Sequence, residues 1–286
     1  MAIDLSRLTE GLVLPKKVAS EIMTNARESS AVMRLGRKIE LPGVGKEIPI
    51  MTGDPIAYWT GETDEAKVSR PTFDSKTIRS YKISVLVPLS NEFLRDAGKF
   101  YREVIRSLPY AVGKRFDQTV FGPQSGAPGQ DFDTLGDSAS VSLDIDAFTA
   151  LVTAKSLVRA GGGRLDGWAL SDDAETILML QKDAVGRPLF LGDVRDDGSV
   201  GRVLSRPVHM TDVVLDDSDR AGFAGSWNHL VYGITDDIRL TMSRDATITD
   251  VDGKQLNLFQ RDMFAVRVDL EIGSRKFGDM FVALTA

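Results

Sequence analysis

The sequence predicts a chain of the α+β class, in which helices and strands alternate along one interwoven fold. Between Tyr81 and Ser90 apolar residues occupy every second position, as they do in a half-buried strand. A helical apolar stripe runs from Tyr101 to Val120. Residues 262–286 then alternate as two strands. Because we find no tandem repeat and no low-complexity linker, we do not expect two halves strung apart.

Composition narrows the possible classes of protein. The 286 residues are 42% hydrophobic, which allows a substantial core, and they include no cysteine, which excludes disulfides and thiolate metal sites. No apolar run approaches the roughly 18 residues of a membrane span, and the N-terminus lacks the basic-then-apolar order of a signal peptide. A net charge of −6 argues against a tight, charge-driven DNA binder.

The N-terminal elements are expected to be short. An extended segment surrounds Pro15, and a helix is predicted from about Lys17 to Glu28. Residues 37–43 and 46–53 have the pattern of short strands. The strand at residues 81–90 should bury one face, which carries Ile83, Val85 and Val87.

The segment from Lys46 to Tyr81 has too few apolar residues to form a core of its own. Its middle offers Val68 and Phe73 and little else. Ordering about 35 residues costs roughly 35 to 70 kcal/mol. Roughly 1,400 to 2,800 Å² of buried apolar surface would be needed to offset that cost. Because strands flank the segment, we expect a projecting two-stranded arm that is either mobile in an isolated subunit or laid across other subunits.

A long helix follows, for which Ser90 is a suitable N-cap and in which Pro109 should produce a kink. Its polar side is basic. The cations on that side are Lys99, Arg102, Arg106, Lys114 and Arg115. A loop rich in glycine, proline and aspartate comes next.

The remaining chain alternates between helices and strands. A helix that starts near Leu143 should turn Ile145, Phe148 and Val152 inward and stop at a run of glycines. A buried strand then precedes a short helix opened by Asp172 or Asp173. Strands bound a long loop after this helix, and Arg275 to Gly278 form the turn between the last two strands.

No motif supports catalysis or a cofactor. His209 and His229 lack neighbouring acid and nucleophile partners, so we interpret both as structural. Two acidic loops, at residues 193–199 and 212–219, could offer oxygens to a hard cation, but neither has the spacing of a calcium loop, and solvated turns are favoured. We therefore predict a protein that is not an enzyme and holds no cofactor or metal.

Several stretches, in this order, carry a resemblance to a known family. A leucine-proline pair, Leu14 and Pro15, precedes the first helix. The most specific stretch comprises Ala57, Trp59, Glu62, Ser69 and Phe73, then a strand, then Ser90, Glu92 or Phe93, Leu94 and Asp96. Another comprises Trp168, Leu178, Leu180, Lys182, Asp183, Gly186, Pro188 and Leu189, and the closing strands end with Phe281 and Val282. Over nearly its whole length the sequence resembles the major capsid proteins of tailed bacteriophages that have the HK97 fold.

The resemblance implies an α+β subunit with an HK97-like capsid fold. Residues 1–45 would form an N-terminal arm and residues 46–82 an extended loop, which is the two-stranded arm. A peripheral domain with the spine helix and its sheet would comprise residues 83–139 and 256–286. Residues 140–255 would form an axial α+β domain, whose acidic loops would meet at the centres of hexamers and pentamers.

The resemblance also implies a function. Copies would assemble as hexamers and pentamers into an icosahedral head around double-stranded DNA, which would be bound without sequence preference. Such heads are virion components assembled in the host cytoplasm, with portal and scaffold proteins as partners, decoration proteins left open, and no membrane. The contact candidates between subunits are Tyr58, Trp59, Glu62, Lys67, Arg70 and Phe73. The DNA-facing candidates are Lys16, Lys17, Lys99, Arg102, Arg106, Lys114 and Arg115.

Two departures from the family and two rival functions stay open. The long scaffolding segment with which many relatives begin is missing here, so we expect scaffolding to be separate or removed. Some relatives link a loop lysine to an asparagine, but we expect Lys67 and Lys76 to be ordinary solvated lysines rather than partners of Asn228 or Asn257. The rivals are an encapsulin-type shell that encloses protein cargo and a soluble acidic enzyme with a dispersed site.

Overall fold

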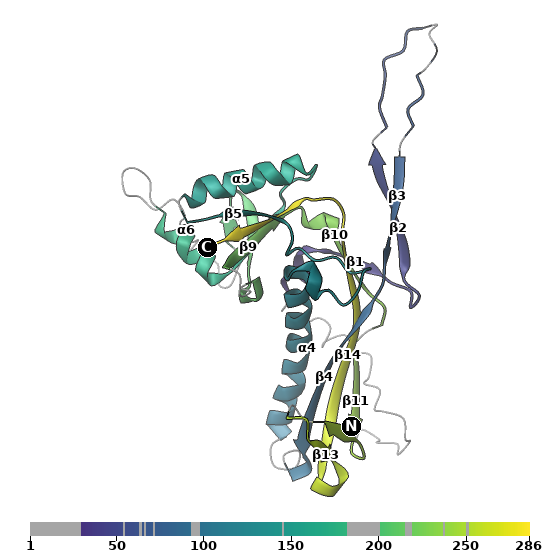
Figure 1. Cartoon of the computed structure of the whole chain (residues 1–286), viewed down its shortest axis with the longest axis vertical. Helices are drawn as coiled ribbons and strands as arrows, with labels where there is room; N and C mark the ends of the chain where they lie inside the picture. The colour runs from purple at the N-terminus through teal and green to yellow at the C-terminus, as the bar shows by residue number, and fades with distance from the viewer. Residues whose placement is uncertain are drawn as a thin grey trace.

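The computed structural model describes residues 30–53, 55–62, 65, 67–70, 72–92, 98–144, 146–181, 201–214, 219–236, 238–249 and 252–286. The molecule is elongated (Figure 1). A narrow two-stranded arm extends from one end, a long helix runs beside a sheet toward the other end, and a second unit lies to one side. Within the described ranges no helix is long and apolar enough to cross a membrane. The helix expected at residues 17–28 lies outside these ranges.

The first sheet has five strands and lies beside the long helix α4 (Gly98–Phe121) (Figure 1). Its strands are β1 (Arg37–Glu40), β4 (Tyr81–Ser90), β10 (Leu230–Ile234), β11 (Arg239–Ser243) and β14 (Met263–Lys276). β14 is the organising strand, because β4, β10 and β11 all pair with it in antiparallel orientation, and β1 adds parallel to β10.

The main core lies between α4 and this sheet. Burial alternates along β4, and its face with Ile83, Val85 and Val87 packs against the core as expected. The described part of the helical stripe is also confirmed. Its buried members are Leu108, Val112, Phe116 and Val120. α4 continues through Pro109 to Phe121, and the kink expected at that proline stays a prediction.

The second sheet has six strands and carries two helices. In sheet order the strands are β5 (Ala139–Ser142), β15 (Phe281–Thr285), β9 (Arg220–Gly225), β6 (Gly167–Leu170), β8 (Arg206–Met210) and β7 (Arg202–Val203). The helices are α5 (Ala147–Ala160) and α6 (Asp172–Leu180). As expected, β6 is buried throughout.

The chain passes between the two sheets more often than we expected. Residues 256–286 were grouped with the long helix, yet β15 belongs to the sheet that carries α5 and α6, while β10 and β11, from the 140–255 segment, belong to the first sheet. The turn after β14, where Gly278 adopts a φ of 72°, redirects the chain from one sheet to the other. The division into a peripheral and an axial domain stays a proposal.

The expected inward face of α5 is wrong. Phe148 and Val152 are exposed, and Ile145 lies outside the described residues. The buried face of α5 is formed by Ala147, Ala150, Leu151, Ala154 and Val158. Small residues let the helix lie close to the sheet, so the stripe that packs contains the alanines rather than the bulkiest side chains. α6 begins at Asp172, one of the two residues expected to open it, and Ser171 is its N-cap, which accepts a hydrogen bond from the Ala174 N–H.

The remaining described elements are short. They are α2 (Ala31–Leu35), β2 (Lys46–Gly53), β3 (Thr72–Ile78), β12 (Thr247–Thr249) and β13 (Gln255–Asn257). Single 3-10 turns occur at η1 (Gln124–Gly126), η2 (Asp212–Val214), η3 (Trp227–His229) and η4 (Phe259–Arg261).

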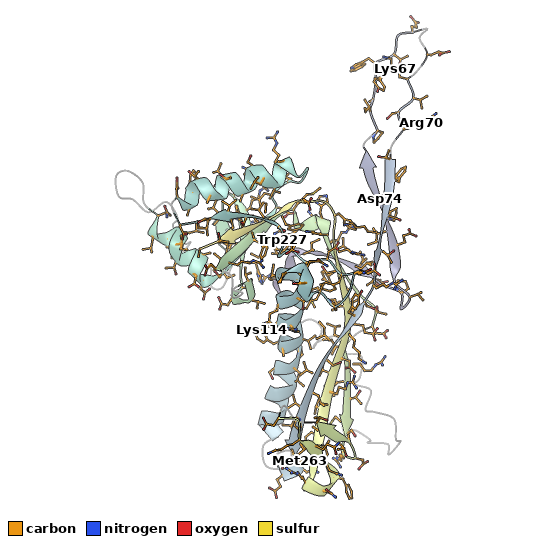
Figure 2. The ribbon with its side chains drawn as sticks, in the orientation of Figure 1. Lys67, Arg70, Asp74, Lys114, Trp227 and Met263 are labelled. Atoms are coloured by element: carbon orange, nitrogen blue, oxygen red, sulfur yellow. The ribbon has the colours of Figure 1, made fainter. Side chains whose placement is uncertain are left out.

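Several long-range contacts among the described residues join the units, including those of Trp227 and Arg220. The Trp227 ring packs edge-on against Phe121 of α4 and Phe281 of β15, at centroid distances of 6.3 and 5.6 Å; Figure 2 shows it where the second unit meets the first. Arg220 of β9 donates to the carbonyls of Phe121 and Gly136 at 3.0 and 2.8 Å, which satisfies an acceptor at the end of α4. These two side chains, together with the stacking of Phe121 of α4 on Phe223 of β9 at 5.2 Å, hold the second unit on α4.

Candidate assembly interface

The candidate functional surface is the arm, which we define as residues 46–78. β2 and β3 pair in antiparallel register from Lys46 opposite Ile78 to Gly53 opposite Thr72. These two strands form a separate two-stranded sheet. Figure 1 shows the paired strands leaving the body and the chain beyond them extending further outward. The structure confirms a projecting two-stranded arm, whose second strand begins at Thr72.

The arm exposes most of its apolar side chains. Trp59 is fully exposed, and Val68 and Phe73 are 80% and 69% exposed. Ile56 and Tyr58 are also exposed. Large apolar side chains that project from a narrow arm into solvent indicate a surface that is covered by a partner.

Contacts within the arm bring its two sides together near the tip. The Ile56 N–H donates to the hydroxyl of Ser69 at 2.7 Å, and the Lys67 ammonium lies 5.4 Å from the centre of the Tyr58 ring. The second distance is within the range of a cation–π interaction. These contacts order the described backbone without burying Trp59.

All six predicted contact residues lie on the arm and are exposed in the structure. They are Tyr58, Trp59, Glu62, Lys67, Arg70 and Phe73. Figure 2 shows Lys67 and Arg70 beyond the paired strands and Asp74 within them. The sequence interpretation omitted Ile56 and Val68 from the contact set. Because apolar residues are scarce in this segment, each of them could have been taken as a candidate contact residue from the sequence.

Charged side chains, together with the buried Ile78 at the end of β3, fix the root of the arm to the body. Arg275 of β14 binds the arm backbone and two aspartates of the loop after α4. Lys76 of β3 reaches back to the body, where its ammonium donates to the Lys276 carbonyl at 3.0 Å. Lys76 is therefore not the freely solvated lysine that we expected.

The predicted basic surface is described at two of its seven positions. Lys114 and Arg115 are exposed on α4, and Figure 2 shows Lys114 projecting from the helix. Lys99, Arg102 and Arg106 belong to α4, but their side chains lie outside the described set, as do Lys16 and Lys17 entirely. Asp117, the described acidic residue in this part of α4, is fully buried, but Asp172 and Asp212 of neighbouring elements line a pocket together with Lys114, so the surface around Lys114 carries both charges.

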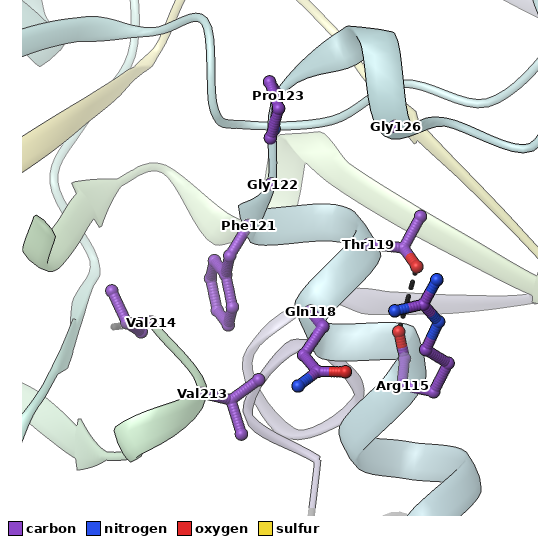
Figure 3. Close-up of a pocket in the computed structure, with 9 residues that line it drawn as sticks. All are labelled: Arg115, Gln118, Thr119, Phe121, Gly122, Pro123, Gly126, Val213 and Val214. Atoms are coloured by element: carbon purple, nitrogen blue, oxygen red, sulfur yellow. Dashed lines mark hydrogen bonds between the residues drawn. The ribbon is translucent and has the colours of Figure 1, made fainter. Parts of the chain in front are cut away.

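Figure 3 shows a cavity of about 260 Å³ beside this surface. It is formed where the end of α4 meets η2 and is lined by Arg115, Gln118, Phe121 and Val213, among others. The Thr119 hydroxyl donates to the Arg115 carbonyl at 2.9 Å and so does not face an outside partner. The lining lacks a converging set of titratable groups and does not suggest a reaction centre.

The two histidines have structural surroundings. His209 is nearly buried in β8, and the Nδ1 of His229 lies 2.9 Å from the Ser226 hydroxyl. Among the described residues there is no group of three or more histidine or carboxylate side chains that could hold a metal. The acidic loop at 193–199 lies outside the described residues, as do Asp216 and Asp217.

Comparison with known proteins is consistent across sequence and structure. The model of the phage capsid family matches residues 10–275. The chain is 28% identical to the probable major capsid protein gp17 of Mycobacterium phage L5, over 96% of this chain and 90% of that protein. A solved structure from Mycobacterium phage Adephagia matches with a TM-score of 0.70 and 22% identity, over 90% of this chain and 89% of that one. A second, from Microbacterium phage Oxtober96, matches with a TM-score of 0.72 and 18% identity, over 100% and 95% of the two chains.

Proposed function

Because this chain belongs to the phage capsid family, whose model matches most of its length, we propose that its copies assemble as hexamers and pentamers into an icosahedral head that encloses double-stranded DNA. The chain is a structural shell subunit with an HK97-like fold. What we propose beyond this role is the arrangement of the subunits as hexamers and pentamers and the double-stranded DNA that the shell encloses.

The exposed arm is the observation that carries self-assembly. An aromatic side chain buries about 150 to 250 Å² when it is fully covered. At about 25 cal/mol per Å², covering Trp59 or Phe73 contributes roughly 4 to 6 kcal/mol before the costs of association. Within the part of its own subunit that the structure describes, neither side chain has such cover. A neighbouring copy is the partner that a shell supplies to every arm.

The surface of α4 is the observation that supports contact with DNA. Lys114 and Arg115 are exposed next to each other, with no described acidic side chain beside them on the helix. Two cations per subunit bind phosphate weakly, but the many copies in a shell present them together. Phosphate contacts carry no sequence information, so such binding suits packaged DNA of any sequence.

The assembly part of the proposal is tested by shortening the arm. Replacing residues 54–71 with an Asn-Gly turn would join Gly53 to Thr72, which face each other in the register, and would keep β2 and β3 paired. We expect this variant to keep the wild-type melting temperature and to form no closed shells by electron microscopy. Normal shells from the shortened chain would refute an essential role for the arm tip.

The content of the shell tests the rest of the proposal. We expect shells isolated from an infected host to contain double-stranded DNA, which nuclease resistance and its length would reveal. Protein cargo in place of DNA would favour the encapsulin-type alternative. Shell assembly in the host cytoplasm, residence in the virion, and portal, scaffold and decoration partners follow from the same proposal. A role in structure rather than catalysis does too.

A further inference from the structure

We propose that Arg275 sets the direction of the arm by binding its root, so that an unassembled subunit presents the arm to its neighbours at one angle. The Arg275 Nε donates to the Thr77 carbonyl of β3 at 2.6 Å. Its Nη1 donates to the Gln130 carbonyl at 3.2 Å and to Asp133 Oδ1 at 2.8 Å, and its Nη2 donates to Asp131 Oδ1 at 2.8 Å. One nearly buried guanidinium thus joins the arm, β14 and the loop after α4.

Further charges complete what we call the root cluster. Its members are Lys76, Arg79, Asp131, Asp133 and Arg275. The Lys76 ammonium lies 3.5 Å from Asp133 Oδ2, and the Arg79 Nε lies 3.3 Å from Asp131 Oδ2. The two carboxylates therefore bind Arg275 from one side and cations of the arm root from the other. Partly buried ion pairs of this kind, with charge-assisted hydrogen bonds to two separate carboxylates, hold geometry better than exposed ion pairs do.

Apolar packing does not fix the same angle. In β3 only Ile78, the last residue of the strand, is buried, and residues 72–75 are exposed. Backbone contact at this point is close, since a Cβ at Gly273 of β14 would lie 2.1 Å from the Arg79 carbonyl. Ile78 and this close approach hold the end of the strand at one point. A contact at one point leaves rotation about it to be set by the polar groups around it.

A small change of angle at the root is large at the tip. An extended strand rises about 3.3 Å per residue, so Trp59 lies about 40 Å along the chain from Lys46. Rotation of the root by about 10° then moves Trp59 by about 7 Å. Side chains in contact lie within about 4 Å of one another. The tip therefore reaches a fixed site on a neighbour only when the root angle is restricted, which makes Arg275 a positioning residue for assembly.

The inference rests on the proposed function and predicts a specific set of variants. Arg275→Gln removes the charge and the fork, whereas Arg275→Lys keeps the charge. A triple variant, Arg275→Gln with Asp131→Asn and Asp133→Asn, leaves no unpaired carboxylate and guards against simple loss of folding. Arg267→Gln is the matched control, because Arg267 lies in the same strand and pairs with Asp269 at 2.9 Å on a part of β14 that faces β4 instead of the arm.

Hydrogen exchange of the unassembled subunits measures the root, and electron microscopy measures the shells. We expect at least tenfold faster exchange at the β2–β3 amides next to the root in the triple variant and in Arg275→Gln, with unchanged exchange in the β11–β14 pairing, which lies away from residue 275. We expect these two variants to give open or irregular shells, Arg275→Lys to give an intermediate yield, and Arg267→Gln to match wild type.

Two results would overturn the inference. One is wild-type exchange at the arm root in the triple variant. The other is a regular shell from the triple variant at the wild-type protein concentration. If wild-type protein itself formed no shells, the proposed function would fail instead, and the exchange data would still report whether Arg275 restrains the arm.

Discussion

The carboxylate of Asp117, in the last two turns of α4, accepts a hydrogen bond at 2.7 Å from the backbone N–H of Ala31, 86 positions earlier in the chain. Its other oxygen accepts from the Val32 N–H at 3.3 Å and from the Ser30 hydroxyl at 2.5 Å. The first N–H groups of a helix have no partner within it. A side chain of the long helix therefore supplies the partner for α2 and fixes the start of the described chain to the core.

This buried carboxylate predicts a particular dependence of stability on pH. Burial, opposed by the hydrogen bonds, raises the pKa of Asp117 to about 7 from 3.8. Between these values the native state binds a proton that the unfolded state has released, so the free energy of unfolding should fall as pH rises. We expect a decrease on the order of 1 kcal/mol between pH 6.5 and pH 8.5, measured by urea unfolding of the unassembled subunit.

Asp117→Asn should remove that decrease, because the amide does not titrate. At pH 6.5 the His209 ring is neutral in the native state but about half protonated in the unfolded state, so it offsets part of the decrease. The difference between wild type and Asp117→Asn isolates Asp117, because both proteins retain His209. The variant should be less stable overall at pH 8.5. The three donors around Asp117 bind both of its carboxylate oxygens, whereas the amide of asparagine has a single acceptor oxygen. A wild-type stability that is flat or rising between pH 6.5 and pH 8.5 would contradict the assignment of Asp117.

Burial of His209 predicts that the free energy of unfolding falls as pH is lowered below 6.5. Burial first, and then the nearby charge of Arg34, lower the pKa of His209 to about 4 from 6.5. As pH falls from 6.5 toward 4, the unfolded state gains a proton that the native state excludes, so stability is lost. His209→Gln should retain on the order of 1 kcal/mol more of its neutral-pH stability than wild type when both are measured at pH 5. Equal losses in the two proteins would show that other groups dominate acid unfolding.

Local patterns predicted the elements whose packing follows from their own sequence. The alternation in residues 81–90 and the stripe of α4 each describe one face of one element, and both faces are buried as predicted. The arm was also predictable, because the lack of apolar residues between its strands ruled out a core of its own. The exposure of Trp59 and Phe73 agrees with that interpretation.

Long-range polar contacts could not be predicted in the same way. Arg275 was interpreted only as part of a turn, yet it binds Thr77, 198 positions away, because β14 and β3 meet at the root of the arm. For α5, apolar content favoured Phe148 and Val152, but close packing on the sheet selected the alanine face. Both outcomes depend on which elements become neighbours, which one sequence does not specify.

The fully exposed side chain of Trp59 should separate assembly from stability. Because the Trp59 side chain buries no surface in the isolated subunit, Trp59→Ala should change the free energy of unfolding by less than about 0.5 kcal/mol. Its loss at an interface should raise the protein concentration needed for shells by at least tenfold, which light scattering over a concentration series would measure. Trp59→Phe should restore part of the yield. An unchanged threshold for Trp59→Ala would exclude this side chain from the interface.

The exposed cations Lys114 and Arg115 predict how strongly the subunit binds DNA. If the exposed face of α4 meets phosphates, the double variant Lys114→Gln, Arg115→Gln should bind DNA more weakly at every sequence and show a flatter dependence of affinity on salt, by up to about two units in the log–log slope. Filter binding of DNA fragments to disassembled capsomers at several salt concentrations measures both quantities.

The matched control for this prediction is the double variant Lys155→Gln, Arg159→Gln. It removes two exposed cations from one helix face of α5, in the second unit, and the same net charge from the chain. If binding depends on overall charge alone, the two double variants will weaken it equally. A loss confined to the α4 variant would place the phosphate contacts on that face, and equal losses would refute it.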